Sequence, residues 1–196
     1  MKLNRIEWWA MNNPVRGWWQ QRVEVPRLLA LGGRCDGATA LEIGGGQGLG
    51  AQLIQQKFGA DQVLSIDLDM TMCRRALRRT ASQGQRHIAQ ADCTQLPLAD
   101  AQFDALFDFG VLHHVPNWQS AAAEITRVAR TGAQLYTMEM YRDFIQHPIW
   151  KRVLTHPQTN RFDHQEFIAC WQQLGWRLTG QHRLTQGMGW STFVKT

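Results

Sequence analysis

The chain has 196 residues, a formal net charge of +5 at pH 7 and a hydrophobic fraction of 44%. This length suits a single α/β domain over residues 1–196, with residues 1–31 as an N-terminal helical lid and 35–196 as the core. No apolar stretch of about 18 residues occurs, which excludes a membrane-spanning helix. The first residues lack the apolar centre of a signal peptide, and the four cysteines form no C-x-x-C pair. We therefore expect a cytoplasmic protein with reduced thiols.

The first part of the chain predicts the start of an α/β sheet. Residues 1–31 are expected to form one or two helices, interrupted at Asn12-Asn13-Pro14. A short apolar run at 39–43 predicts a buried strand, and glycines between 44 and 50 follow it before a segment with helical spacing. Strand, glycine turn and helix in this order are typical of a doubly wound sheet, whose ligands bind beyond the carboxyl ends of the strands.

The glycine turn alone does not identify the ligand. Residues 46–51 fit the G-x-G-x-x-G/A fingerprint of dinucleotide-binding proteins. Glu42 lies two residues before the first glycine, and its carboxylate would repel a pyrophosphate but attract a cationic group. S-adenosylmethionine has an ammonium and a sulfonium group and no phosphate. The turn therefore favours this ligand over a nicotinamide dinucleotide.

Four more strands are predicted after the glycine turn, with helices between them, at residues 62–66, 87–90, 103–109 and 133–140. Asp67 ends the second strand, at the position where an acidic side chain binds ribose hydroxyls in both cofactor classes. Asp92 follows the third strand in the same way. We expect these carboxylates to gather at the carboxyl edge of the sheet.

The remaining elements complete the sheet. Asn117 is expected to cap a helix, and a further helix at 164–174 ends at Gly175. Alternating polarity predicts two antiparallel closing strands, at 176–179 and 190–194. The predicted fold is a Rossmann-like, seven-stranded, mostly parallel sheet with helices on both faces and a reversed C-terminal hairpin.

A longer motif narrows the function. Residues 103–115 contain Phe-Asp and, after a strand, Val-Leu-His-His-Val. Together with the glycine turn, Asp67 and Asp92, this motif resembles the class I S-adenosylmethionine-dependent methyltransferases of type 11, from about residue 41 to 136. The resemblance implies S-adenosylmethionine as the cofactor and S-adenosylhomocysteine as its product. It also implies in-line transfer of a methyl group to an acceptor.

The resemblance also implies roles for individual residues. Asp92 would bind the adenine amino group beside the Cys93 backbone, and Leu68 would pack on the adenine face. The complete set of expected cofactor-binding residues is Glu42, Gly44, Gly46, Gln47, Gly48, Asp67, Leu68, Asp92, Cys93 and Phe109. Gly45 stands where the family often has cysteine, serine or alanine, and we expect this change to be harmless. Members of this family often have a turn with a proline and glycines before the fifth strand. This chain keeps one glycine of that turn, Gly132, but lacks the proline.

The acceptor side is predicted from the ends of the fourth and fifth strands and from the lid. His113 is the candidate catalytic base, because histidine titrates near neutral pH; the alternative is that both histidines only shape the loop. Glu139 either orients a substrate or is a hydrogen-bonded strand end. The expected substrate-binding residues are Trp18, Trp19, His114, Trp118, Glu139 and Tyr141, whose rings favour a small apolar or aromatic acceptor.

Several alternatives stay open. A non-catalytic S-adenosylmethionine-binding module is the second function class, and a nicotinamide oxidoreductase, which would need a Y-x-x-x-K pair, is the third. The N-terminal tryptophan pairs could anchor helices, close the acceptor pocket or contact a membrane, in that order of preference.

We also expect a small-molecule acceptor, no nucleic-acid partner, and a monomer or homodimer. The arginines near residues 74–79 are attributed to a solvated helix face. No metal is expected, and the spacing of Glu139, Asp143 and His147 is attributed to chance.

Overall fold

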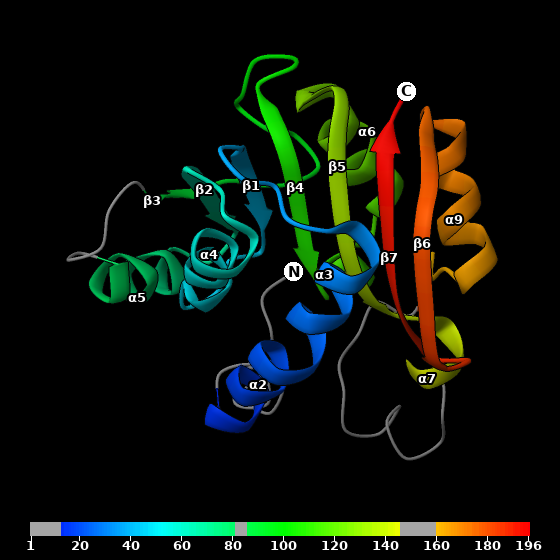
Figure 1. The fold of residues 1–196 in the computed structure, drawn as a ribbon, viewed down its shortest axis with the longest axis horizontal. Helices are drawn as coiled ribbons and strands as arrows, with labels where there is room; N and C mark the ends of the chain where they lie inside the picture. Colours follow the sequence, from blue (N-terminus) through cyan, green and yellow to red (C-terminus); the bar gives the residue numbers. More distant parts are fainter. Residues whose placement is uncertain (1–12, 81–85, 146–159) are drawn as a thin grey trace.

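The computed structural model describes residues 13–80, 86–145 and 160–196. Its centre is a seven-stranded sheet in the order β3-β2-β1-β4-β5-β7-β6 (Figure 1). The first five strands are parallel, and β7 lies antiparallel between β5 and β6. The strands are β1 (Thr39–Ile43), β2 (Gln62–Asp67), β3 (Arg86–Gln90), β4 (Phe103–Phe109), β5 (Ala129–Met140), β6 (Trp176–Thr185) and β7 (Met188–Lys195). The predicted Rossmann-like sheet with a reversed C-terminal hairpin is confirmed.

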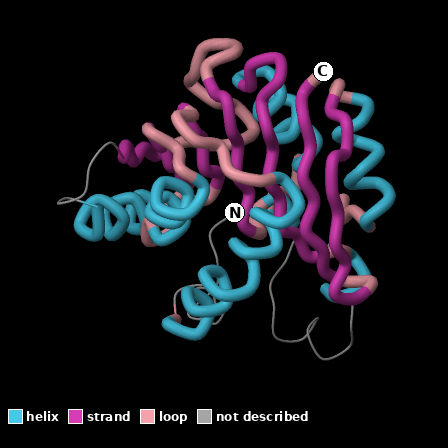
Figure 2. Tube along the Cα trace, in the orientation of Figure 1, coloured by secondary structure: helices cyan, strands magenta, loops and turns pink. Residues whose placement is uncertain are grey.

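Helices cover both faces of this sheet (Figure 2). They are α2 (Pro14–Trp19), α3 (Val25–Gly32), α4 (Leu49–Leu53), α5 (Met70–Thr80), α6 (Trp118–Val128), α7 (Arg142–Ile145) and α9 (His164–Gln173), with π-helical turns η1 (Gln20–Glu24) and η2 (Ile54–Phe58) and the 3-10 turn η3 (Leu112–His114). Within the described ranges, no helix has the length and apolar content needed to cross a membrane.

Alternating side chains of the strands build two hydrophobic cores. On one face, Leu28 of α3 and Phe58 of η2 pack with Phe107 of β4. On the other face, Ile125 of α6 and Trp171 of α9 pack with strand residues such as Leu41 and Leu106. Successive side chains of a strand point to opposite faces of the sheet. The face on which a polar residue at a strand end lies therefore depends on whether its position along the strand is odd or even.

Element boundaries differ from the sequence predictions at a few places. The strand β5 begins at Ala129 instead of residue 133, because Ala129 is buried and pairs with Phe103. Both hairpin strands are longer than predicted, since β6 and β7 stay paired until Thr185 and Met188. The helix α6 does begin after Asn117, but the Asn117 side chain makes no capping hydrogen bond.

The N-terminal helical run begins at the predicted interruption. Asn13 caps α2, with its side-chain oxygen accepting a hydrogen bond from the Arg16 amide at 2.9 Å. From Pro14 to Gly32 the helical segments α2, η1 and α3 follow one another without a break, and α3 packs on β5, β6 and β7. Residues 1–12, which include the tryptophan pair at positions 8 and 9, lie outside the described ranges.

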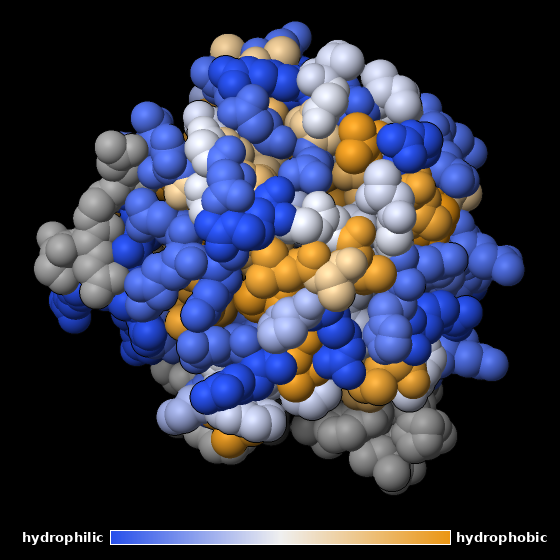
Figure 3. All heavy atoms as spheres, in the orientation of Figure 1, coloured by the Kyte–Doolittle hydropathy of each residue, from blue (hydrophilic) through white to orange (hydrophobic). Residues whose placement is uncertain are grey.

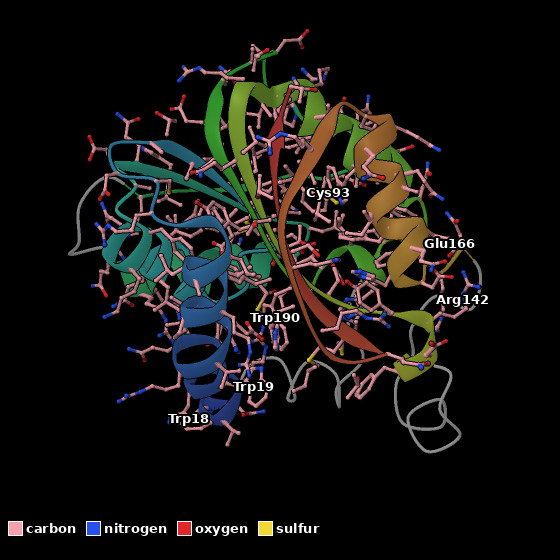
Figure 4. The ribbon with its side chains drawn as sticks, turned by 45° about the vertical axis from the view of Figure 1, so that its right-hand side comes forward. Trp18, Trp19, Cys93, Arg142, Glu166 and Trp190 are labelled. Carbon is pink, nitrogen blue, oxygen red and sulfur yellow. The ribbon has the colours of Figure 1, made fainter. Side chains whose placement is uncertain are left out.

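The described tryptophans differ in burial. Trp171, Trp176 and Trp190 are fully buried, and the Arg27 guanidinium lies 4.7 Å from the Trp190 ring. Trp18, in contrast, is 59% exposed on α2, and Figure 4 shows it at the far end of the N-terminal helix from the sheet. Hydrophobic residues gather near the middle of the face in Figure 3, bordered by hydrophilic side chains. Most described tryptophans therefore serve the cores.

An ion pair joins two elements at the edge of the sheet. Arg142 at the start of α7 contacts Glu166 in the first turn of α9, and Figure 4 shows the two side chains facing each other. Glu166 also completes a capping box with Asp163. This contact fixes the segment that follows β5 against α9.

Candidate functional site

A cavity of about 780 Å³ lies at the carboxyl ends of β1, β2 and β4. Its wall includes Ile43, Asp67 and Phe109, which end these strands, together with residues of α2. Nine of the ten residues predicted to bind the cofactor line this cavity: Glu42, Gly44, Gly46, Gln47, Asp67, Leu68, Asp92, Cys93 and Phe109. The exception is Gly48, where a Cβ would lie 3.0 Å from Ala76 of α5. Gly48 therefore permits the close approach of the turn to α5.

The glycine turn presents bare backbone to the cavity. Gly44 has a φ of +65°, and a Cβ there would lie 2.4 Å from the Val111 side chain. Gly46 has a φ of +52°, and a Cβ there would meet no atom within 4 Å. Because Gly46 lines the cavity, this open space is the cavity itself. A ligand can thus approach the Gly46 backbone directly.

Asp67 ties two backbone segments together at the end of β2. Its Oδ2 accepts a hydrogen bond from the Gly46 amide at 2.9 Å, and its Oδ1 accepts one from the Asp69 amide at 2.8 Å. Burial raises the pKa of this carboxyl above its ordinary value. Each carboxylate oxygen can accept a second hydrogen bond, so the group can still bind ligand hydroxyls.

Asp92 follows β3 and lines the same cavity as Asp67. Its Oδ1 accepts hydrogen bonds from the Thr94 amide at 2.8 Å and the Thr94 hydroxyl at 2.7 Å, which lower the pKa of the carboxyl. Burial raises the pKa of the neighbouring Cys93 thiol to about 12. Cys93 is therefore a neutral thiol that contributes surface to the cavity and no charge.

Glu42 is a buried carboxyl at the wall of the cavity. Its Oε2 accepts a hydrogen bond from the Ser65 hydroxyl at 2.6 Å, and burial raises the pKa of Glu42 to about 7. A Cβ at Gly45 would lie only 1.7 Å from the Ser65 Oγ. We expected glycine at position 45 to be a harmless change. The structure shows that glycine is required there, because Ser65 leaves no space for a side chain.

A second cluster of buried polar groups lies under the turn that follows β4. Glu139 Oε1 accepts a hydrogen bond from the Leu112 amide at 2.7 Å, and Glu139 Oε2 lies 2.5 Å from His113 Nδ1. Asp108 hydrogen-bonds Glu139 and accepts a hydrogen bond from the Val111 amide at 2.9 Å. Burial raises the pKa of both carboxyls, and the charge of Glu139 raises that of Asp108 further.

The two histidines of this turn face different surroundings. His113 is 5% exposed and lines a water-sized cavity of about 10 Å³ beside Phe162. His114 lines the large cavity. The ring centroids of the two histidines are 4.1 Å apart. The structure thus brings His114 to the large cavity and places the preferred base, His113, in the buried cluster with Glu139.

The structure does not bring the other predicted acceptor residues to the large cavity, whose lining omits Trp18, Trp19, Trp118, Glu139 and Tyr141. Trp118 is buried against Phe162 and Phe167. The Tyr141 hydroxyl lies 2.9 Å from His164 Nδ1. Trp19 packs, partly buried, on the core between α3 and α4. With the exception of the exposed Trp18, these aromatic side chains pack in or against the cores, where burial of their apolar surface stabilises the fold.

Polar residues of the N-terminal helical run line the cavity, and sequence reasoning missed them. They are Asn13, Arg16, Gln20 and Gln21. Arg16 Nη1 contacts Glu24 Oε2 at 3.1 Å, and Arg16 Nη2 donates to the Phe109 carbonyl at 3.3 Å. Positions 13, 16, 20 and 21 share one face of a helix, and this spacing is the signal that could have found them.

Two further expectations concern charge and metals. On α5, Arg74, Arg78 and Arg79 are exposed, and Arg79 also lines the cavity. Across the described ranges, no three side chains among histidine, cysteine, aspartate and glutamate come close enough to hold a metal ion. His147 lies outside those ranges.

The cluster under the turn predicts a pH-dependent stability. Since the pKa values of Asp108 and Glu139 are raised, the folded state binds their protons more tightly than the unfolded state does. The two protonated carboxyls thus make their full contribution to stability at acidic pH. This contribution is lost as the pH rises through their raised pKa values. Asp108→Asn keeps a neutral, hydrogen-bonding side chain. We expect it to raise the free energy of unfolding at pH 8 by more than about 1 kcal/mol.

Urea unfolding of Asp108→Asn and the parent chain at about pH 3.5 and at pH 8 measures this effect. The difference should be small at the lower pH, because an aspartate with its ordinary pKa of 3.8 is mostly protonated there in the unfolded chain as well. Asp61→Asn, at an exposed position before β2, is the matched control and should show no pH-dependent difference. An equal effect of Asp108→Asn at both pH values would contradict the raised pKa of Asp108.

Comparison with known proteins agrees with this geometry. The chain matches the family described as "Methyltransferase domain" over residues 41–137. It is 29% identical over 140 residues to malonyl-[acyl-carrier protein] O-methyltransferase of Hamiltonella defensa, covering 69% of this chain and 52% of that protein. It is 33% identical over 122 residues to a Mycobacterium tuberculosis protein named "Probable S-adenosylmethionine-dependent methyltransferase", covering 62% of this chain and 42% of the other. The chain thus spans about half the length of these curated relatives.

A solved structure has a similar fold. It is described as a "Complex between the Haloferax volcanii Trm112 methyltransferase activator and the putative methyltransferase". The similarity has a TM-score of 0.81 at 16% sequence identity and covers 99% of both chains. The chain belongs to the class I S-adenosylmethionine-dependent methyltransferases. The cofactor that this family and fold imply is S-adenosylmethionine.

Proposed function

We propose that this chain is a methyltransferase that moves a methyl group from S-adenosylmethionine to a small molecule by in-line displacement. The observation that supports this most is the cavity of about 780 Å³ that the glycine turn, Asp67 and Asp92 share with α2 and His114. Cavities for small ligands commonly measure about 300–1,000 Å³. A volume in the upper part of this range suits a cofactor together with a small acceptor.

The residues fit the chemical groups of the cofactor. Asp67 would accept hydrogen bonds from the two ribose hydroxyls, and Asp92 would accept one from the adenine amino group. Leu68, 41% exposed beside them, would pack on the adenine ring. Glu42 would place negative charge near the ammonium and sulfonium end. When bound, S-adenosylmethionine supplies a methyl group already activated by its sulfonium.

The protein would contribute to catalysis mainly by holding and orienting the cofactor and the acceptor. The rigid glycine turn would fix the cofactor, and the α2 side of the cavity would hold the acceptor in line with the methyl group. Correct alignment alone can supply much of the rate enhancement of such a displacement. No residue needs to form a covalent bond with either ligand.

Several polar side chains line the cavity on the side of α2, which changes the expected acceptor. Asn13, Arg16 and Gln20 come from α2 and η1, and His114 and Asn117 come from the turn after β4. We propose an acceptor with at least one polar or anionic group, instead of a purely apolar or aromatic molecule. The name of one relative, malonyl-[acyl-carrier protein] O-methyltransferase, describes transfer to oxygen, which agrees with a polar acceptor.

His114 replaces His113 as the proposed general base. His114 belongs to the wall of the cavity, whereas His113 is held by Glu139 in the buried cluster. A base is needed for a hydroxyl acceptor or a protonated amine, and a positioned base contributes about 10²–10⁴-fold. A carboxylate acceptor is already ionised and would need none.

The test is formation of S-adenosylhomocysteine with a panel of small hydroxyl, amine and carboxylate acceptors. We expect turnover with at least one of them and a loss of about 10²-fold or more in kcat for a hydroxyl acceptor in His114→Gln. His113→Gln is the matched comparison and should mainly lower the unfolding temperature. Binding of S-adenosylmethionine without turnover across the panel would instead favour the non-catalytic module.

A further inference from the structure

Glu42, Ser65 and Gly45 form one packed unit beside the cavity. Glu42 and Ser65 are direct neighbours in the register of β1 and β2, so their side chains lie on the same face of the sheet. The Ser65 hydroxyl donates to Glu42 Oε2 at 2.6 Å, and Ser65 and Glu42 are 1% and 2% exposed, respectively. Glu42 lines the cavity and Ser65 does not. Ser65 can therefore act on a bound ligand only through Glu42.

The second oxygen of Glu42 lies against the start of α4. A Cβ at Gly50 would lie 1.7 Å from Glu42 Oε1, so the carboxylate occupies space that this glycine leaves free in α4. The Ala51 amide hydrogen-bonds the same carboxylate. The carboxylate is thus held from β2 and from the start of α4.

Gly45 shares its space with the Ser65 hydroxyl. Gly45 has no positive φ, so its backbone alone does not require glycine. A Cβ at this position would nevertheless lie 1.7 Å from Ser65 Oγ and 3.0 Å from Glu42 Oε2. Any other residue at position 45 would displace the hydroxyl from Glu42. The glycine and the serine are therefore a sterically coupled pair.

We propose that Ser65 is a positioning residue of the cofactor site, which holds the Glu42 carboxylate toward the cavity, and that Gly45 is glycine in order to admit the Ser65 hydroxyl. This inference rests on the proposed binding of S-adenosylmethionine. A hydroxyl that donates to a buried carboxylate stabilises its charged form. Without Ser65, Glu42 would be protonated over a wider pH range and would lose its attraction for a cationic ligand.

The surroundings of Glu42 contain few other charges. Asp67, at the end of β2, raises the pKa of Glu42, whereas the hydrogen bonds from Ser65 and the Ala51 amide lower it. The helix α4 has no ionisable side chain between Leu49 and Leu53. Arg16, on the α2 side of the cavity, contacts Glu24 and the Phe109 carbonyl. Ser65 is thus the main side chain that favours ionised Glu42.

Calorimetric titration with S-adenosylmethionine between pH 6 and pH 9 tests the role of Ser65. In the parent chain, affinity should fall as the pH drops through about 7, where Glu42 takes up a proton. Ser65→Ala should bind at least about tenfold more weakly at pH 7, and the midpoint of its pH profile should lie at higher pH. Ser120→Ala, on α6, is the matched control. An unchanged midpoint in Ser65→Ala would overturn the positioning role.

A double substitution tests the steric coupling. Gly45→Ala alone should lower both the unfolding temperature and the affinity for S-adenosylmethionine. Adding Ser65→Gly removes the clashing hydroxyl, so the double variant should regain the unfolding temperature that Gly45→Ala loses. It should also keep the shifted pH profile of Ser65→Ala, since Glu42 still lacks its donor. A double variant no more stable than Gly45→Ala would overturn the coupling.

The two proposals fail in different ways. If the parent chain does not bind S-adenosylmethionine at any pH, the proposed function fails. The unfolding temperatures of the single and double variants still decide whether Gly45 and Ser65 are coupled. If the parent chain binds but Ser65→Ala has the parental pH profile, only the inference on Ser65 fails.

Discussion

Gly46→Val is expected to abolish binding of S-adenosylmethionine while the chain still folds. A Cβ at Gly46 points into the open cavity, so the valine side chain would occupy ligand space instead of clashing with the protein. The backbone φ of +52° is also unfavourable for valine and costs about 1–3 kcal/mol of stability. Calorimetry should detect no binding, and circular dichroism should show a folded protein that melts at a lower temperature.

Gly132→Val is the matched control for this substitution. Gly132 has a φ of +82°, and a Cβ there also meets no atom within 4 Å, but Gly132 does not line the cavity. This variant should therefore lose comparable stability and keep the parental affinity. Parental affinity in Gly46→Val would contradict the placement of the ligand against the glycine turn.

Asp67→Ala is expected to have the second largest effect on cofactor affinity. It removes the proposed acceptors of the ribose hydroxyls and the two hydrogen bonds that hold the Gly46 and Asp69 amides. Hydrogen bonds to a charged group contribute about 1.5–3 kcal/mol each, so losing two should weaken binding at least about a hundredfold.

Titration of this variant with S-adenosylhomocysteine measures the loss. Asp61→Ala removes an exposed carboxylate at the opposite end of β2 and is the matched control, with parental affinity expected. Should Asp67→Ala bind as tightly as the parent chain, Asp67 would have no role in ribose recognition and would only brace the turn.

The cofactor side of the site could be predicted from the sequence because its residues follow strands directly. The glycine turn comes after β1, Asp67 ends β2, and Asp92 lies two residues beyond β3. In a parallel sheet, the carboxyl ends of the strands meet at one edge, so order along the chain determines proximity in space. Nine of the ten predicted residues therefore line one cavity.

The acceptor side could not be predicted in this way, because tertiary packing decides where an aromatic ring points. Trp118 and Tyr141 follow β4 and β5 as expected, yet both are buried in the core beside α9. The polar residues of α2 line the cavity instead, and their contact with it depends on how α2 docks against the end of β4. The sequence shows the helical spacing of these residues, but it does not show that they face the end of β4.

The choice between the two histidines depended on one short turn. Neighbouring residues of a 3-10 helix, which has about three residues per turn, point in directions about 120° apart. In η3, the His113 ring contacts Glu139, and the next residue, His114, contributes to the wall of the cavity. The motif identified both side chains but could not indicate which of them a buried carboxylate would hold.

The role of Gly45 depended on a neighbour in another strand. Positions 45 and 65 are far apart in the sequence, and nothing in the glycine turn itself indicates that a serine from β2 fills its space. Only the register of β1 with β2 places Ser65 beside Glu42 and under Gly45.

Calorimetric titration of the unmodified chain with S-adenosylhomocysteine and, separately, with NAD tests the central claim most directly. The cavity has carboxylates suited to ribose, adenine and a cationic end group, and Glu42 disfavours a pyrophosphate beside the glycine turn. We predict saturable binding of S-adenosylhomocysteine at one site and no detectable binding of NAD. Binding of NAD, or no binding of S-adenosylhomocysteine, would contradict the account.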